Sequence, residues 1–293
     1  MPYNICYTCI DTNEWKYVGE AGAEIQCRNS HTLAIITVKD DLSGTTTDSS
    51  TKDKAAPARH ALVLYGGASP ESGLLSDAYY AILPSDLNEI GESSFFVNWL
   101  PVITSPSQPK IGGLEMHGSV VYDGSLIFTG GRSEEGMSSA TWSLECKRVP
   151  RAPASPSSSQ AATVTHDVEF TWRLLPHLAL PLGRCSHSCA LWDGRYLCVF
   201  GGFTSDAQIS GDLLLIDLAS QSPSWTAVTC QPPLEPRFGA TMCTAPSWYP
   251  SVAISASPIS TSSVEGLRRG GLLIYGGVDA ERDFDILQCI TPP

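Results

Sequence analysis

The chain has 293 residues, of which 42% are hydrophobic and 16% charged, and its formal net charge is −12. This acidic balance argues against binding nucleic acid or an anionic membrane through bulk electrostatics, and no apolar run approaches the roughly 18 residues of a membrane span. The ten cysteines lie mostly inside apolar stretches, as small buried hydrophobes do. We therefore expect a reducing compartment, the cytoplasm or alternatively the nucleus.

The first two units of the chain follow one pattern of short apolar strands. Residues 1–19 contain one strand and then Trp15, which matches the second half of a four-stranded unit. The first complete unit spans about 28–101. Its strands are expected at about 32–38, 60–65 and 77–83, and Trp99 marks the fourth.

The same pattern continues to the end of the chain. The second unit covers about 114–175, with a hairpin that turns at Asp123 and Gly124 and with Trp172 in its last strand. The third covers about 184–228 and ends at Trp225. The last runs over about 237–291 and supplies three strands without a closing tryptophan.

Paired glycines and phased tryptophans recur in register through these units. The glycine pairs end the second strand of each unit, where the chain must turn sharply out of a sheet. The tryptophans suit packing between neighbouring units. The residues are Gly66, Gly67, Gly130, Gly131, Gly201, Gly202, Gly276, Gly277, Trp15, Trp99, Trp172 and Trp225.

This repeat resembles the kelch repeat, one blade of a β-propeller. The resemblance implies an all-β fold in which 1–293 form a single propeller region of four-stranded blades, with strands A to D running outward from the axis. Four polar, Ser/Thr/Pro-rich insertions, at 39–58, 84–97, 147–165 and 246–269, are expected to be disordered. A meander places all four on the face of the A–B and C–D turns. The opposite face holds the B–C loops and the links between blades.

Counting strands predicts an incomplete propeller. The chain begins and ends within a blade, and a closing blade built from both ends would hold five strands, one too many. We therefore expect part of a larger propeller or an unusual truncated one. Open sheet edges and apolar blade faces would favour self-association.

Three arginines stand just before strand A of their blades and are candidates for ligand binding. They are Arg28, Arg184 and Arg237. In kelch propellers that recognise acidic peptides, arginines at this position line the central pocket, and a guanidinium grips a carboxylate with two bonds. The second blade has Leu114 instead, which leaves such a ring incomplete. Alternatively, each arginine pairs with a neighbouring carboxylate and only ties blades together.

The favoured function is a non-catalytic interaction module that binds an acidic or polar peptide of a protein partner on the B–C loop face. Arg132 and Asp206, in loops after glycine pairs, complete the candidate set. No catalytic motif, cofactor motif or plausible metal-ligand spacing is found. Two alternatives stay open: an accessory propeller of a larger enzyme, as in the carboxyl methyltransferase-like enzyme of wybutosine tRNA modification, and a small catalytic kelch protein of the nitrile-specifier type.

Overall fold

A computed structural model describes residues 5–9, 14–40, 59–84, 96–149, 168–245 and 270–290 of the chain. The side chains of 5–9, 14–20 and Phe96 are not described. Most of each expected insertion lies outside the described residues. Their edges, however, continue strands, because β3 runs through Lys39, β8 begins at Phe96 and β13 extends to Arg148.

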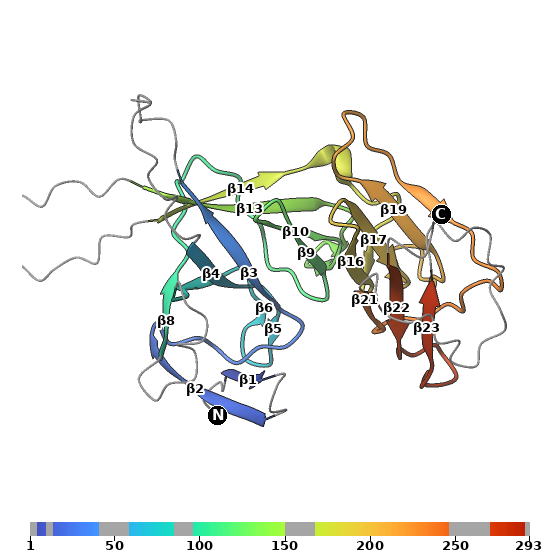
Figure 1. The fold of residues 1–293 in the computed structure, drawn as a ribbon, viewed down its shortest axis with the longest axis horizontal. Coiled ribbons are helices and arrows are strands. Elements are labelled where there is room, and N and C mark those ends of the chain that lie inside the picture. The colour runs from blue at the N-terminus through green and yellow to red at the C-terminus, as the bar shows by residue number, and fades with distance from the viewer. Residues whose placement is uncertain are drawn as a thin grey trace, which may run out of the picture.

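The described chain is almost entirely β-structure and forms an incomplete β-propeller, which confirms the expected fold class. Successive antiparallel sheets follow one another along an open arc, from blue at the left to red at the right of Figure 1. Among the described residues, the one helical element is a short 3₁₀ turn, η3 (Pro176–Leu178), and no helix is long and apolar enough to cross a membrane.

The first blade contains strands A to D in meander order, each paired with the next. They are β3 (Thr32–Lys39), β4 (Arg59–Tyr65), β7 (Ala78–Ile82) and β8 (Phe96–Pro101). An N-terminal hairpin of β1 (Ile5–Cys9) and β2 (Glu14–Gly22) extends this sheet, with β2 parallel to β8. The hairpin therefore lies along the outer edge of the first blade.

The second and third blades repeat the meander. The second contains β9 (Gly118–Tyr122), β10 (Ser125–Thr129), β13 (Thr141–Arg148) and β14 (Val168–Leu174). The third contains β16 (Ser188–Trp192), β17 (Tyr196–Phe200), β19 (Leu213–Asp217) and β20 (Thr226–Val228). The far ends of β3 and β13 also pair in parallel, which joins the first two blades into one sheet.

The last sheet has three strands in the described residues: β21 (Thr241–Ala245), β22 (Gly271–Tyr275) and β23 (Leu287–Ile290). Short paired strands form in the loops: β5 (Ala68–Ser69) with β6 (Gly73–Leu74), β11 (Arg132–Ser133) with β12 (Gly136–Met137), and β15 (Arg184–Cys185) with β18 (Phe203–Thr204).

The core is divided into layers between neighbouring blades. One cluster joins the first two blades around Tyr65, Phe128 and Trp172, whose rings lie 5.0 to 5.8 Å apart. Two further clusters lie between the second and third blades and between the third and last. Strand B is covered on both faces. This explains why all five side chains of β10 are buried and why its sequence does not alternate between apolar and polar residues.

The glycine pairs have the same backbone in all four sheets. Their eight φ angles lie between 67° and 98°, a region that non-glycine residues rarely adopt. Space is also restricted, because a Cβ on Gly202 would lie 2.7 Å from the carbonyl oxygen of Cys185. Trp99 and Trp172 are buried, and the half-buried Trp225 donates Nε1–H to the carbonyl of Ala179 at 2.8 Å. The side chain of Trp15 lies outside the described residues.

Candidate functional site

The B–C loops and the links between blades form one continuous surface, which we call the loop face. Each link pairs with the B–C loop of the blade that it enters, through the same kind of short bridge. Asn29 pairs with Ala68, Glu115 with Arg132, Cys185 with Phe203, and Phe238 with Val278. The loop face comprises residues 23–31, 66–77, 102–117, 130–140, 175–187, 201–212, 229–240 and 276–286.

A chain of backbone hydrogen bonds, which we call the belt, joins the four links. The N–H of Met116 donates to the carbonyl of Ser30 at 3.1 Å, Ser186 donates to Met116 at 2.9 Å, and Gly239 donates to Ser186 at 2.8 Å. All four residues have positive φ, from 53° to 66°. Residues with different side chains share this unusual backbone conformation, which indicates that the geometry between the blades imposes it.

A second set of bonds ties each glycine pair to the next blade. The N–H of Gly67 donates to Leu114, that of Gly131 to Arg184 and that of Gly202 to Arg237, all at 2.8 or 2.9 Å. The acceptors are the residues at the arginine position of the repeat. The loop face is thus built on a backbone scaffold that is the same at every blade.

The three candidate arginines are buried inside this scaffold, with exposed fractions of 7% or less. Each donates through Nη1 to the carbonyl of the first glycine of its own blade: Arg28 to Gly66 at 3.1 Å, Arg184 to Gly201 at 3.1 Å, and Arg237 to Gly276 at 3.3 Å. Burial lowers the pKa of Arg184 and Arg237. The arginines therefore hold the turn at the end of strand B.

The remaining donors of Arg28 and Arg237 find side-chain partners within the chain, whereas those of Arg184 are less well satisfied. Arg28 forms a two-bond ion pair with Asp77, at 2.6 and 2.9 Å. Nη2 of Arg237 donates to the side chain of Gln288, and the Arg237 guanidinium lies 4.3 Å from the ring centre of Phe284. Arg184 is the loosest, because it approaches Asp212 only to 4.0 Å and its Nε has no partner in the described chain.

Arg132 and Asp206 are exposed on the loop face, unlike the three arginines. Arg132 donates to Glu115, whose side chain is only 2% exposed, with Nε at 2.6 Å from Oε1. Asp206 accepts a bond from the Thr204 hydroxyl at 2.6 Å. The structure does not bring Arg132 together with Arg28, Arg184 and Arg237 as one set of free cations, because the guanidiniums of these three are occupied within their blades.

The exposed charges of the loop face are mainly acidic. Exposed basic side chains of these segments include Lys110, Arg132 and Arg282, and Arg282 is itself paired with Glu235 at 2.9 Å. The exposed acidic side chains are more numerous: Glu24, Glu71, Glu134, Glu135, Asp206, Asp212, Glu235, Glu281, Asp283 and Asp285. The candidate arginines give the acidic-peptide expectation no support, because Arg28, Arg184 and Arg237 are buried. Arg132 is exposed but is paired with Glu115.

Two histidines, the half-buried His117 and the buried His187, follow the arginine position by three residues. His117 Nε2 lies 2.7 Å from the hydroxyl of Thr32 in the preceding blade. Burial lowers the pKa of His117 to about 4 and that of His187 to about 3. Both imidazoles are therefore neutral near pH 7. Among the described residues, no group of three or more His, Cys, Asp or Glu is placed to hold a metal.

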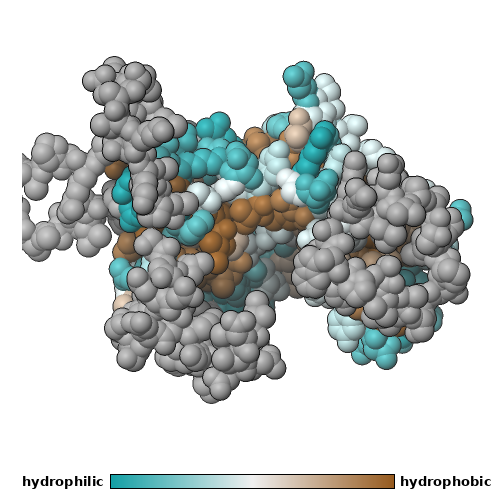
Figure 2. All heavy atoms as spheres, in the orientation of Figure 1, coloured by the Kyte–Doolittle hydropathy of each residue, from teal (hydrophilic) through white to brown (hydrophobic). Residues whose placement is uncertain are grey.

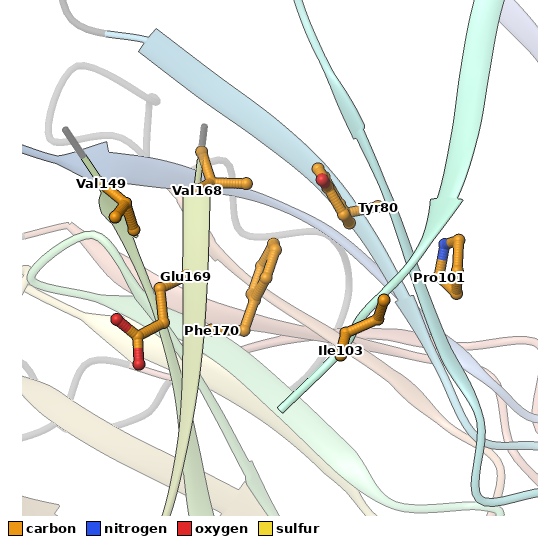
Figure 3. Close-up of a pocket in the computed structure, with 7 residues that line it drawn as sticks. All are labelled: Tyr80, Pro101, Ile103, Val149, Val168, Glu169 and Phe170. Carbon is orange, nitrogen blue, oxygen red and sulfur yellow. The ribbon is translucent and has the colours of Figure 1, made fainter. Parts of the chain in front are cut away.

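One apolar cleft of about 260 Å³ lies between β7 and β8 of the first blade and β13 and β14 of the second. In Figure 3, Phe170 of β14 points across the cleft toward Tyr80 and Ile103, and Glu169 points to the other side of β14. Glu169 is its one charged lining residue in the described chain. The cleft is a packing gap between two blades rather than a polar site.

The comparisons with known proteins give relatives but no family assignment. No family model matches the chain. Over 173 residues the chain is 27% identical to putative adagio-like protein 2 of Oryza sativa subsp. japonica, and over 103 residues it is 29% identical to adagio-like protein 3 of the same plant. These alignments cover 57% and 35% of this chain but only 22% and 14% of the relatives, so the chain spans less than a quarter of their length.

A solved structure titled "Structure of YjhT" aligns with 90% of this chain and 62% of its own, at 13% identity and a TM-score of 0.49. The fold assignment therefore depends on the sheets of this chain itself.

Proposed function

We propose that this chain is a non-catalytic protein-interaction module, a kelch-type propeller region that binds a segment of a partner protein on its loop face. The similarity to Adagio-like proteins, a family with kelch repeats, supports this proposal. The regular recurrence of a glycine pair at the end of each strand B also supports it.

The observation that carries the proposal is the contrast between a uniform scaffold and varied loops. The same bridge, belt bond and glycine contact recur from blade to blade. The loops that project from them differ in side chains, as at Ala68, Arg132, Phe203 and Val278. A rigid framework that presents variable loops is the usual arrangement of a binding surface.

The charge of the loop face indicates the partner chemistry. Because the exposed side chains are mainly acidic, a basic or polar peptide segment suits this face better than an acidic one. Glu134 and Glu135, at the tip of the β11–β12 hairpin, are two exposed acidic residues that are adjacent in sequence. The two enzyme alternatives and the cytosolic or nuclear location stay predictions.

Fluorescence anisotropy with labelled twelve-residue model peptides tests this function. A Lys/Ser peptide is expected to bind more tightly than Glu/Ser and Gly/Ser peptides, and its binding should weaken as salt is added. The double variant Glu134→Lys/Glu135→Lys should lose about fivefold in affinity, or about 1 kcal/mol. Tighter binding of the Glu/Ser peptide would contradict the proposed partner chemistry.

The matched control is Asp40→Lys/Glu169→Lys, which changes the net charge equally on the insertion side of the blades. Asp40 follows β3 and Glu169 lies near the start of β14, and both are exposed. This control should bind the Lys/Ser peptide within about twofold of the natural chain. Equal loss in both variants would mean that only net charge, and not the loop face, attracts the peptide.

A further inference from the structure

The two ends of the arc expose the side chains that every internal interface buries. The last residue of strand B faces the next blade: Tyr65, Thr129 and Phe200 are at most 1% exposed, whereas the equivalent Tyr275 of the last sheet is 55% exposed. On the opposite side of the first blade, Leu33 and Ile35 of β3 are 47% and 49% exposed. In Figure 2 a band of apolar side chains crosses the middle of the visible face, where β3 lies in Figure 1.

We call these two surfaces the first end face, which carries Leu33 and Ile35, and the last end face, which carries Tyr275 and its cross-strand partner Leu287. Leu287, the first residue of β23, is half-buried. Both faces are apolar sheet surfaces, and each internal blade interface joins one face of each kind. Apolar sheet faces of this sort are normally covered.

Backbone groups at the two ends are complementary as well. In the belt, the N–H of each link donates to the carbonyl of the link before it. By the same rule, the N–H of Ser30 would donate to a preceding blade, and the carbonyl of Gly239 would accept from a following blade. The second glycine of each pair donates its N–H to the residue at the arginine position of the next blade. At the two ends of the arc, the N–H of Gly277 therefore lacks such an acceptor, and the carbonyl of Arg28 lacks such a donor. Within the described residues, none of these four groups has a backbone partner. The last end therefore offers the acceptor and the donor that the first end needs.

One side-chain pair repeats the same relationship. The first residue of strand A in one blade contacts the histidine position of the next, as Thr32 contacts His117 at 2.7 Å. The equivalents at the free ends are Thr241 and His31. Both are exposed, whereas Thr32 and His187 are buried. Thr241 of one molecule can thus contact His31 of another as Thr32 contacts His117.

We propose that two copies of this chain assemble head to tail, with the last end face of each copy covering the first end face of the other. The chain supplies four blade sheets along an open arc, so two copies together contain eight, within the range of four to eight blades found in propellers. The contact joins two different surfaces, and the assembly closes because there are two such contacts around a twofold axis. The observation favouring a second copy over an unrelated partner is this continuity with the internal blade interface.

Size-exclusion chromatography with light scattering over a dilution series tests the assembly. The natural chain, with a mass of 31.3 kDa, should elute at twice its own mass. Tyr275→Asp and Ile35→Asp should each shift it to the monomer, with circular dichroism spectra unchanged. Ile103→Asp is the matched control, because Ile103 is 63% exposed but lies in the cleft between two blades; it should stay dimeric.

An engineered cysteine pair distinguishes contact between two chains from contact within one chain. Thr241→Cys with His31→Cys, in a chain whose exposed Cys27, Cys243 and Cys289 are replaced by serine, should form disulfide-linked dimers on oxidation. The proposal is overturned by a monomer at every concentration, by open-ended oligomers, by a dimer that resists both end-face variants, or by a disulfide within one chain. A last sheet covered by another segment of the same chain would give the monomer result.

Discussion

Arg28 and Asp77 form a two-bond ion pair beneath the B–C loop of the first blade, with Nη1 2.6 Å from Oδ1 and Nη2 2.9 Å from Oδ2. Burial alone would raise the pKa of Asp77, but the bonds from Arg28 outweigh it and leave that pKa below its usual value. The equivalent pair in the third blade, Arg184 and Asp212, is only within 4.0 Å. This contrast allows the structural role of the arginines to be measured.

Replacing Asp77 by Ala is expected to destabilise the chain by about 2 kcal/mol, because it leaves the buried Arg28 guanidinium without its counter-charge. The loss is less than that of a fully buried pair, since the Asp77 side chain is 38% exposed. Asp212→Ala should cost about 0.5 kcal/mol or less, because its carboxylate is 63% exposed. Urea denaturation followed by tryptophan fluorescence measures both, and equal losses would contradict this explanation.

Arg237→Lys tests whether the arginines hold the fold rather than a ligand. A lysine cannot make the bonds to both Gly276 and Gln288 while lying over the ring of Phe284. We expect a loss of about 2 kcal/mol in unfolding free energy. Arg195→Lys is the control, because Arg195 pairs with Asp217 at the surface, where ion pairs contribute little. A variant of Arg237 with full stability but lost peptide binding would restore the ligand-binding interpretation.

Stability should fall as the pH is lowered from 6.5 towards 4, because the folded chain keeps two histidines neutral, the half-buried His117 and the buried His187. The pKa of His117 is lowered to about 4 and that of His187 to about 3, by burial first and then by neighbouring cationic groups. The unfolded chain therefore binds more protons than the folded chain in this window, so protonation favours unfolding.

Between pH 7.5 and pH 5 each of these histidines should account for a loss of about 2 kcal/mol. Melting temperatures measured across this range by circular dichroism should fall steeply in the natural chain. His117→Gln/His187→Gln should have a flatter profile, whereas His177→Gln, at an exposed position, should keep the natural one. A profile that does not change in the double variant would assign the acid sensitivity to other groups.

Gly202→Ala should be strongly destabilising. Its φ is 94°, and an added Cβ would lie 2.7 Å from the carbonyl oxygen of Cys185 and 2.8 Å from the Cβ of His187. Gly194, in the turn between β16 and β17, has a φ of 60° and open space around it. Gly194→Ala should therefore cost only the backbone strain, about 1 kcal/mol, and Gly202→Ala at least about 3 kcal/mol. Chemical denaturation of the two variants compares them directly.

Much of the fold could be predicted from the sequence because its signals are local. A glycine pair is needed wherever strand B turns through positive φ, and apolar runs of five residues mark strands covered on both faces. The strand edges were less predictable. Lys39, Phe96 and Arg148 lie in polar or mixed sequence, yet pairing with neighbouring strands keeps them in the sheets.

The site was harder to predict, because the environment of an arginine depends on residues far away in sequence. Arg28 and its partner Asp77 are 49 residues apart, and Gln288 is 51 residues from Arg237. One signal was available: an aspartate follows the first glycine of the pair at the same spacing in the first and third blades, at Asp77 after Gly66 and at Asp212 after Gly201. The belt left no signal in the sequence, because backbone atoms form it. Its four positions have no side-chain type in common: they are Ser30, Met116, Ser186 and Gly239.

That independence from side chains has an evolutionary consequence. Mutational drift at the belt positions can replace serine, methionine or glycine while the links between blades keep their hydrogen bonds. The strain of a left-handed backbone limits which residues are tolerated there, with β-branched ones excluded first. Selection can therefore rewrite the chemistry of the surface around the axis blade by blade, and the architecture beneath it need not change.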